Sequence, residues 1–330
     1  MRPRTRVTPV TAPRAVGVRL PYAEVPRRVR DWVDRELGSP VATYEEQVGG
    51  MSPGCATRVV GADGSRAFVK AVGPELNPDS PTLFRREIEV LDLIGENPLW
   101  ASLRASYDDG AWVALLLEDV PGGHPDLGDD AEMDVLLTAT DRLVSTLGSV
   151  RVPETAARAT NVAQPGLIDV RARFRAWASA LDHLADLPED LVPDEVRRDP
   201  ARLRRLVALL LEGDDQLSHW DIRVDNLLRP GPGRIVFVDW GSAGVGPAWN
   251  DPLLARFERV EDRWFDESVA RSPVLAEAGD EVVTAFLVAF GAALAWQSTR
   301  APSDIGLPTL NEFRRTQARR ALTAAARRLG

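Results

Sequence analysis

The sequence contains very little lysine, cysteine and histidine. Of its 40 basic residues, 39 are arginine and only Lys70 is lysine. The single cysteine, Cys55, excludes an internal disulfide framework and any zinc site built from several cysteines. The three histidines are far apart in the chain, which argues against a histidine-rich metal centre. In a chain that uses arginine almost everywhere else, Lys70 is either a surface residue without a role or a functional residue.

Long hydrophobic runs are also lacking. The longest mainly apolar stretch, residues 282–296, has 15 residues and is shorter than the roughly 20 that span a bilayer. We expect it to form a buried helix. Residues 1–20 are interrupted by proline and arginine and contain no apolar segment typical of a signal peptide. We therefore expect a cytoplasmic protein with no membrane partner.

The 330 residues suffice for about two domains or lobes, and the net charge is −9. This charge argues against general nucleic-acid binding, which requires a basic surface, and is compatible with a cationic partner. Residues 1–40 carry nine arginines against four acidic residues, a net +5, so the other 290 residues carry −14. A basic arm that binds phosphate is one interpretation of the start of the chain up to Leu20, and a solvated tail is the one we favour.

Hydrophobic patterns divide the chain into parts. Strand-like patterns dominate over residues 43–118, interrupted by one helix for which Ser80 is the expected N-cap and Pro81 the first helical residue. Beyond residue 123 helical patterns dominate, apart from a β-rich segment over 226–239. The patterns predict an α+β chain. Its parts are an N-terminal extension and helix (1–40), a small β-rich N-lobe with one helix (41–121), and a larger, mainly helical C-lobe (122–330).

The densest polar cluster, HWDIRVDN at 219–226, lies immediately before two strand candidates that are joined by Pro-Gly-Pro-Gly. Pairing Arg229 with Arg234 across this turn would bring Asp239 close to Asn226. A carboxylate and an amide oxygen that lie close together suit Mg²⁺ better than zinc. A polar loop followed by an ordinary hairpin is the alternative.

This cluster resembles the catalytic loop of protein kinases and, more closely, the H-x-D-x-x-x-x-N loop of the aminoglycoside phosphotransferase family. The segment VDWG at 238–241 looks like the metal-binding Asp-Phe-Gly element of kinases, with tryptophan in place of phenylalanine. The resemblance implies a bilobal protein-kinase-like fold in which Asp221 is the catalytic aspartate and Asn226 and Asp239 hold Mg²⁺. It also implies that His219 orients the loop and that Arg223 lies near the transferred phosphoryl group.

Lys70 lies in the middle of AFVKAV at 67–72, which resembles the V-A-I-K strand of kinases. On the next helix Phe84, Ile88 and Leu91 form an apolar stripe, and Glu87 falls inside it. A carboxylate on a buried face is costly unless it is paired, and Lys70 is its natural partner. The family resemblance makes the same assignment and implies that Lys70 pairs with the nucleotide phosphates. A surface lysine and an incidental glutamate are the alternative.

Two further segments resemble nucleotide-binding segments of kinases and antibiotic phosphotransferases. Residues 49–54 lie between strand candidates and look like the loop that covers the nucleotide in antibiotic phosphotransferases, although Pro53 departs from G-x-G-x-x-G and a plain hairpin turn is the alternative. The loop residues implied in binding are Gly49, Gly50, Ser52 and Gly54. Residues 118–121, after the apolar strand candidate 112–117, resemble the hinge between the kinase lobes, which implies that the Glu118 carbonyl and the Val120 amide bind adenine.

The resemblance implies transfer of the γ-phosphate of ATP (or GTP), with Mg²⁺, to a hydroxyl of an aminoglycoside-like or other amino/hydroxyl metabolite. Asp239 and Asp251 lie so close together in the sequence that no room is left between them for the long activation loop of a protein kinase. Besides a protein kinase, the other alternative is a non-catalytic nucleotide-binding regulator. The five polar groups expected of an active enzyme are nevertheless all present: Lys70, Glu87, Asp221, Asn226 and Asp239. We assign Asp251 a structural role, anchoring the catalytic loop.

Overall fold

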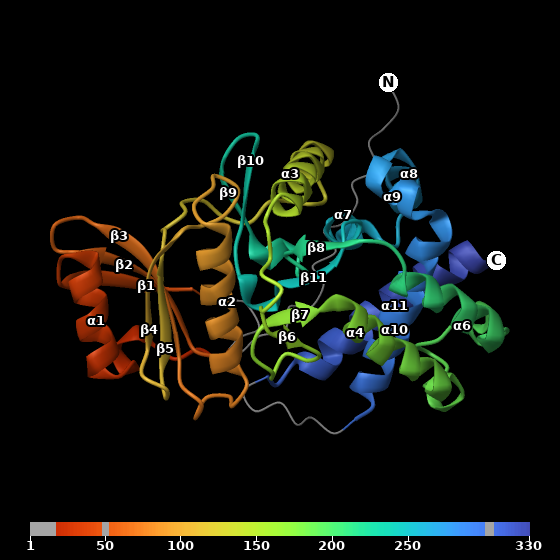
Figure 1. The fold of residues 1–330 in the computed structure, drawn as a ribbon, viewed down its shortest axis with the longest axis horizontal. Coiled ribbons are helices and arrows are strands. Elements are labelled where there is room, and N and C mark those ends of the chain that lie inside the picture. The colour runs from red at the N-terminus through yellow and green to blue at the C-terminus, as the bar shows by residue number, and fades with distance from the viewer. Residues whose placement is uncertain (1–17, 48–52, 301–306) are drawn as a thin grey trace.

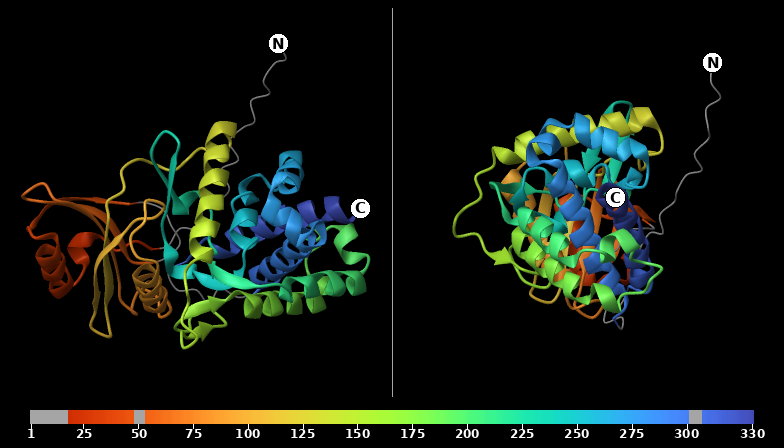
Figure 2. Two further views of the ribbon diagram at one scale, coloured as in Figure 1. Left: turned by 45° about the horizontal axis from the view of Figure 1, so that its top comes forward. Right: turned by 90° about the vertical axis from the view of Figure 1, so that its right-hand side faces the viewer.

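The chain folds into two lobes that lie next to each other along the long axis of the molecule (Figures 1 and 2). The computed structural model describes residues 18–47, 53–300 and 307–330. The N-lobe is built on a β-sheet and the C-lobe is mainly helical, which confirms the predicted α+β architecture.

The N-lobe contains one antiparallel five-stranded sheet in the order β1-β2-β3-β5-β4. Its strands are β1 (Val41–Glu46), β2 (Cys55–Gly61), β3 (Arg66–Val72), β4 (Leu103–Asp108) and β5 (Val113–Leu117). The turn between β2 and β3 contains Gly64, whose φ of +86° suits glycine. Lys70 lies in the centre of the sheet, where it pairs with Ala56 on one side and Leu115 on the other.

Two helices, α1 (Arg27–Leu37) and α2 (Ser80–Ile94), cover opposite faces of this sheet (Figure 1). We predicted α2 in this lobe and assigned the other helix to the N-terminal extension. The structure shows that this other helix, α1, also packs on the sheet of the N-lobe. Val29, Trp32 and Val33 of α1 are buried in the core cluster on one face of the sheet. Burial of this apolar stripe makes α1 part of the N-lobe core.

The start of α2 also differs from the prediction. Ser80 is the first helical residue, and Asp79 occupies the N-cap position. The side-chain oxygen of Asn77 accepts hydrogen bonds from the backbone N–H groups of Asp79 and Ser80 at 2.9 and 3.1 Å. These groups have no partner inside the helix, so Asn77 satisfies them in place of the expected cap.

The C-lobe surrounds one long apolar helix, α10. The helices of this lobe are α3 (Asp130–Gly148), α4 (Val170–Ala178), α5 (Asp194–Arg197), α6 (Pro200–Ala208), α7 (Asn250–Leu254), α8 (Arg263–Arg271), α9 (Pro273–Ala278), α10 (Asp280–Ser298) and α11 (Leu310–Leu329). By length and composition α10 could cross a membrane, but 67% of its apolar window is buried inside the protein. The predicted buried helix over 282–296 is therefore confirmed as a core helix.

Six short strands complete the C-lobe. They are β6 (Arg158–Ala159), β7 (Leu167–Asp169), β8 (Asp215–Ser218), β9 (Leu227–Gly231), β10 (Arg234–Phe237) and β11 (Gly244–Pro247). The β9–β10 hairpin occupies the predicted β-rich segment. The sequence analysis missed the sheet β6-β7-β11-β8, because strands of two to four residues are too short to show an alternating pattern.

The register of the β9–β10 hairpin differs from the prediction. Arg234 lies opposite Gly231 rather than Arg229, so the turn has only two residues, and an irregular pairing follows it. The backbone N–H of Val238 donates to the carbonyl oxygen of Asn226 at 3.0 Å. Asn226 therefore still lies beside the chain segment that carries the other predicted metal ligand.

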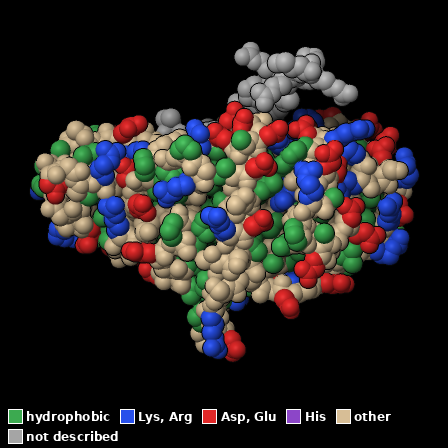
Figure 3. Space-filling view, turned by 90° about the horizontal axis from the view of Figure 1, so that it is seen from above, with side chains coloured by type: hydrophobic (Ala, Val, Ile, Leu, Met, Phe, Trp, Pro, Cys, Tyr) green, Lys and Arg blue, Asp and Glu red, His purple; other side chains and the backbone are tan. Residues whose placement is uncertain are grey.

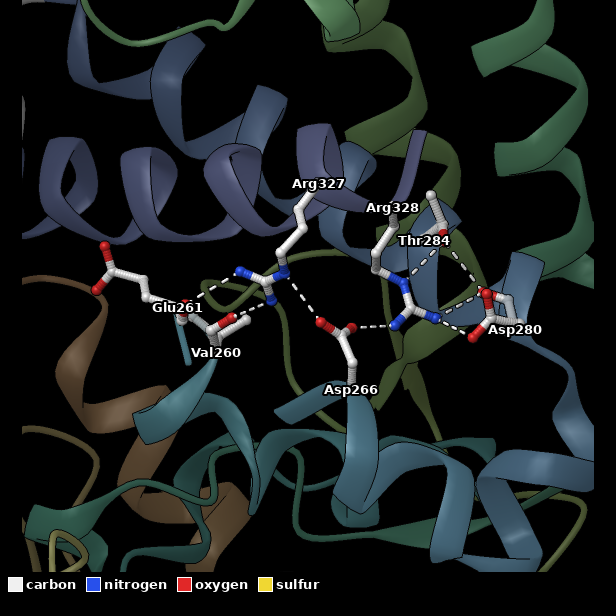
Figure 4. A network of polar contacts seen from close by, with 7 residues as sticks. All are labelled: Val260, Glu261, Asp266, Asp280, Thr284, Arg327 and Arg328. Carbon is white, nitrogen blue, oxygen red and sulfur yellow. Dashed lines mark hydrogen bonds and ion pairs between the residues drawn. The ribbon is translucent and has the colours of Figure 1, made fainter. Parts of the chain in front are cut away.

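A polar network holds the end of α11 against α8 and the start of α10 (Figure 4). Asp266 accepts a hydrogen bond from Arg327 at 2.9 Å and also contacts Arg328. Arg328 in turn contacts Asp280 and donates to Thr284 Oγ1 at 3.0 Å. The side chain of Arg328 is only 7% exposed, so water cannot readily replace a lost partner.

We expect Asp266→Ala to lower the free energy of unfolding by about 1–3 kcal/mol, because two arginines lose their shared acceptor. Urea unfolding followed by circular dichroism measures this change. Asp182→Ala is the matched control: it removes an ion pair with Arg204 in which both side chains are more than half exposed, and should cost less than about 1 kcal/mol. Equal losses in the two variants would contradict a stabilising role for the network.

Candidate functional site

Lys70, Glu87 and Asp239 come from β3, α2 and the loop after β10, and the structure brings them together. The Lys70 ammonium contacts a carboxylate oxygen of Glu87 and lies 2.9 Å from Oδ1 of Asp239. The side chains of Lys70 and Glu87 are 11% and 1% exposed. The other carboxylate oxygen of Glu87 accepts a hydrogen bond from the backbone N–H of Trp240 at 3.4 Å. The two lobes are thus joined through one buried cluster of charges.

The charges of Lys70 and Asp239 support each other, whereas burial raises the pKa of the Glu87 carboxyl and Lys70 only partly offsets this. Burial alone would lower the pKa of the Lys70 ammonium, but the carboxylates of Asp239 and Glu87 outweigh it and raise that pKa. Burial alone would raise the pKa of Asp239, but the Lys70 ammonium outweighs it, and the pKa of Asp239 falls below its usual value. Lys70 and Asp239 therefore both stay charged at neutral pH.

Asp251, at the start of α7, holds the loop that follows β8. Its carboxylate accepts hydrogen bonds from Ser218 Oγ at 2.9 Å and from the backbone N–H groups of His219 and Trp220 at 2.8 and 2.9 Å. Trp220 has a φ of +65°, which is uncommon for a residue other than glycine and requires support from its surroundings. These contacts are those of a residue that anchors the loop.

We expect Asp251→Ala to lower the free energy of unfolding by about 2–4 kcal/mol, because buried N–H and O–H donors lose their acceptor. Asp251→Asn should lose less, since it keeps one acceptor oxygen. Urea unfolding of both variants tests this. An alanine variant as stable as the wild type would show that the loop does not depend on Asp251.

His219 and Asn226 both fix the position of Asp221. The backbone N–H of Asp221 donates to Nδ1 of His219 at 3.3 Å, so the other ring nitrogen, Nε2, carries the proton and donates to the Val238 carbonyl at 3.1 Å. Nδ2 of Asn226 donates to the carbonyl oxygen and to Oδ2 of Asp221 at 2.9 and 3.0 Å. Because the amide nitrogen is used in this way, the amide oxygen of Asn226 is the atom that could coordinate a metal.

Arg223 lies against the carboxylate of Asp221. Its Nε is 3.4 Å from Oδ1 of Asp221, and its Nη2 is 3.0 Å from Oδ2 of Asp225. The guanidinium also lies 5.8 Å from the ring centroid of Phe313 on α11. Burial raises the pKa of the Asp221 carboxyl, and Arg223 opposes this without cancelling it. The sequence analysis identified neither Asp225 nor Phe313 as neighbours of this site.

The oxygen atoms of Asn226 and Asp239 fit a magnesium ion. Both are hard donors, and the Asp239 side chain is ionised and 29% exposed. Mg²⁺ is usually bound by one or two protein oxygens, with water and phosphate oxygens completing its coordination. Among the residues that the structure describes, no group of three or more His, Cys, Asp or Glu could hold a metal. The donors thus suit a metal shared with a phosphorylated ligand better than a site made of protein alone.

Only one of the predicted glycine-loop residues can be described. Gly49, Gly50 and Ser52 lie outside the described residues. Gly54 is buried with a φ of +126°, and a Cβ at this position would lie 2.7 Å from the carbonyl oxygen of Ala71. Both its conformation and its close approach to β3 therefore require glycine.

Glu118 and Val120 follow β5, where the chain leaves the N-lobe sheet. The Val120 carbonyl accepts a hydrogen bond from Arg58 at 2.9 Å, and the Asp119 carboxylate lies 3.4 Å from Arg58 and 2.9 Å from Arg66. These contacts use neither the Glu118 carbonyl nor the Val120 N–H, the two groups predicted to bind adenine. The arginines fix the backbone of this segment from the side of β2 and β3.

Arg86 is a buried residue next to Glu87 that the sequence analysis missed. Its guanidinium donates to the carbonyl oxygens of Gly241, after β10, and of Gln164, before β7, at 2.8 and 2.6 Å. Burial lowers the pKa of Arg86 to about 10, which leaves it protonated at neutral pH. Arg86 thereby ties α2, and with it Glu87, to the C-lobe. In an arginine-rich sequence, only its position beside Glu87 could have drawn attention to it.

Cys55, the residue after Gly54, is a free, buried cysteine. Burial raises the pKa of its thiol to about 12. At pH 8 we expect iodoacetamide to modify the native chain about a thousandfold more slowly than the urea-unfolded chain, because the thiolate is correspondingly scarce. Mass spectrometry of timed samples measures both rates, and similar rates would contradict the burial of Cys55.

Solved structures with similar folds span nearly the whole chain. Aminoglycoside phosphotransferase APH(4)-Ia, in a ternary complex with ADP and hygromycin B, is 16% identical with a TM-score of 0.64, covering 91% of this chain and 98% of the other. Macrolide 2′-phosphotransferase MphH from Brachybacterium faecium is 17% identical with a TM-score of 0.56, covering 90% and 96%. Choline kinase LicA from Streptococcus pneumoniae is 13% identical with a TM-score of 0.55, covering 89% and 99%. At these identities the comparisons show the shared fold.

Sequence comparison shows the family. No curated protein matches this chain significantly. The family model described as "Phosphotransferase enzyme family" matches residues 56–271, which is more than half of the chain. This region contains Lys70 and Glu87 in the N-lobe and the whole segment from His219 to Asp239 in the C-lobe. The chain therefore belongs to the phosphotransferase enzyme family.

Proposed function

We propose that the chain transfers the γ-phosphate of ATP to a hydroxyl group of a small molecule, with Asp221 as the catalytic base. The observation that carries this proposal is the arrangement of Asp221 and Asn226, in direct contact, beside the cluster of Lys70, Glu87 and Asp239. Phosphoryl transfer depends mainly on positioning and on neutralising charge, and these residue types supply both.

In this proposal Asp221 accepts a hydrogen bond from the acceptor hydroxyl and takes its proton as the oxygen attacks the γ-phosphorus. The bond to the leaving oxygen of ADP breaks as the new bond forms. The raised pKa of Asp221 makes it a stronger base than an exposed aspartate. Arg223, which lies beside Asp221, would interact with the transferred phosphoryl group.

Nucleotide binding would use residues from both lobes. Lys70, held by Glu87, would pair with the α- and β-phosphates. Asn226 and Asp239 would hold Mg²⁺, which neutralises charge on the β- and γ-phosphate oxygens when bound. Adenine would be bound by the Glu118 carbonyl and the Val120 N–H, and Gly49, Gly50, Ser52 and Gly54 would cover the phosphates. GTP is the alternative nucleotide.

The acceptor we propose is a small amino or hydroxyl metabolite in the cytoplasm, with an aminoglycoside-like antibiotic as the first candidate. The similar structures are named as aminoglycoside, macrolide and choline enzymes, which supports a small-molecule acceptor. The charge of −14 on residues 41–330 favours a cationic one. On the face shown in Figure 3, acidic and basic side chains are mixed, unlike the basic surface that nucleic-acid binding requires.

The test is to incubate the chain with Mg²⁺, ATP or GTP, and a panel of aminoglycosides, macrolides, choline and related amino alcohols. We expect one class of acceptor to gain the mass of one phosphoryl group. Nucleotide binding without transfer to any acceptor would favour the non-catalytic regulator. A chain that binds neither ATP nor GTP would overturn the proposal.

A further inference from the structure

The segment before α1 is attached to the N-lobe near the candidate nucleotide site. The residues on either side of Arg19 form two backbone hydrogen bonds of 3.2 Å with Gly54, so that Arg19 and Gly54 make a parallel bridge. Further along, the N–H of Tyr22 donates to Glu46 Oε1 at 2.7 Å, and Tyr22 is 4% exposed. The solvated tail that we favoured for the start of the chain is therefore wrong for residues 18–20, because their backbone pairs with Gly54.

This attachment places Arg19 close to the cluster of Lys70 and Asp239. Gly54 precedes β2, and Ala56 on that strand pairs with Lys70. Burial lowers the pKa of the Arg19 guanidinium, and the nearby carboxylate of Asp239 acts in the opposite direction. The same carboxylate lies 2.9 Å from Nζ of Lys70. Two cations from distant parts of the sequence therefore approach one carboxylate.

We propose that Arg19 binds the β- or γ-phosphate of the nucleotide, as a second cation beside Lys70. A metal held by Asp239 would be shared with these two phosphates when bound, which would bring their negative charge close to the carboxylate that acts electrostatically on Arg19. A guanidinium suits phosphate because it donates two parallel hydrogen bonds, and its partial burial limits screening by salt. The match to the family model begins at residue 56, so Arg19 lies outside the region shared with the family.

The inference rests on the proposed function and predicts a dependence on the number of phosphates. We expect Arg19→Ala to weaken binding of MgATP and MgADP about ten- to a hundredfold and to leave AMP binding unchanged, measured by isothermal titration. Arg19→Lys should recover part of the loss, because it keeps the charge. Arg27→Ala is the matched control, since this arginine lies in the same region with its side chain 86% exposed, and it should bind all three nucleotides like the wild type.

The measurements separate binding from a structural role. The bridge to Gly54 is made by the backbone and survives in Arg19→Ala, so unchanged AMP binding would show that the nucleotide site is intact in this variant. Equal affinities of Arg19→Ala and wild type for MgATP would overturn the inference alone. Equal weakening for ATP and AMP would also overturn it, because Arg19 would then act on the fold and not on the β- or γ-phosphate. A wild-type chain that binds no nucleotide would overturn the proposed function itself.

Discussion

Asp221→Asn should lower kcat for phosphoryl transfer by about 10²–10⁴-fold while leaving the Kd for MgATP within about threefold of the wild type. The substituted amide keeps the shape of the side chain, and its oxygen can still accept the hydrogen bond that Asn226 donates to Oδ2. What is lost is the ability to take a proton. Single-turnover transfer with labelled ATP, alongside equilibrium nucleotide binding, measures the two effects separately.

Asp225→Asn is the control for this experiment, because it removes a second carboxylate from the same loop without removing the candidate base. Asp225 is paired with Arg223, and the substituted amide keeps an oxygen that can accept from this arginine, so we expect a loss smaller than about tenfold. The wild type should also show a kcat/KM that rises with pH through the raised pKa of Asp221, since only the deprotonated carboxylate can act as base. Turnover by Asp221→Asn within tenfold of the wild type would remove Asp221 from this role.

The sequence alone predicted the parts of the site that depend on local patterns. Lys70 is the only lysine of the sequence and lies in a strand-like segment. Glu87 is a carboxylate inside an apolar helical stripe. Each pattern lies within a single strand or helix, and the cost of burying an unpaired charge links the two. The spacing of Asp221, Asn226 and Asp239 was likewise contained in one continuous segment.

The parts that the sequence did not predict depend on contacts between distant segments. The hairpin register was wrong because a turn of two residues and one of four are both compatible with Pro-Gly-Pro-Gly, and only the pairing decides. Arg86 and Arg19 are two of 39 arginines, and what distinguishes them is that carbonyls or a carboxylate from elsewhere in the chain meet them in partly or fully buried positions. Such contacts leave no periodic signal in a single sequence.

Lys70→Met should lower kcat/KM for ATP by about 10²–10³-fold and also lower the free energy of unfolding by about 3–5 kcal/mol. The first effect arises because the phosphates lose a positioned cation. The second arises because Glu87, which is 1% exposed, becomes a buried charge without its partner. Steady-state kinetics and urea unfolding of the same preparation measure the two effects.

The double variant Lys70→Met/Glu87→Gln separates these effects. Because it removes both charges of the pair, it should recover most of the free energy of unfolding and still show the low kcat/KM of the single variant. Recovery of activity together with stability would instead mean that Lys70 serves the fold and not the nucleotide.

Lys70→Arg completes the series, because it keeps the charge and changes only its shape. The ammonium of Lys70 directs its donors to Glu87 and Asp239 at once, in a position where the side chain is 11% exposed. A guanidinium is planar and larger, so it cannot reproduce this geometry without displacing α2 or the loop that carries Asp239. We expect at least a tenfold loss of kcat/KM, and a fully active arginine variant would show that shape does not matter here. The expected loss would account for a lysine at this position in a chain whose other 39 basic residues are arginine.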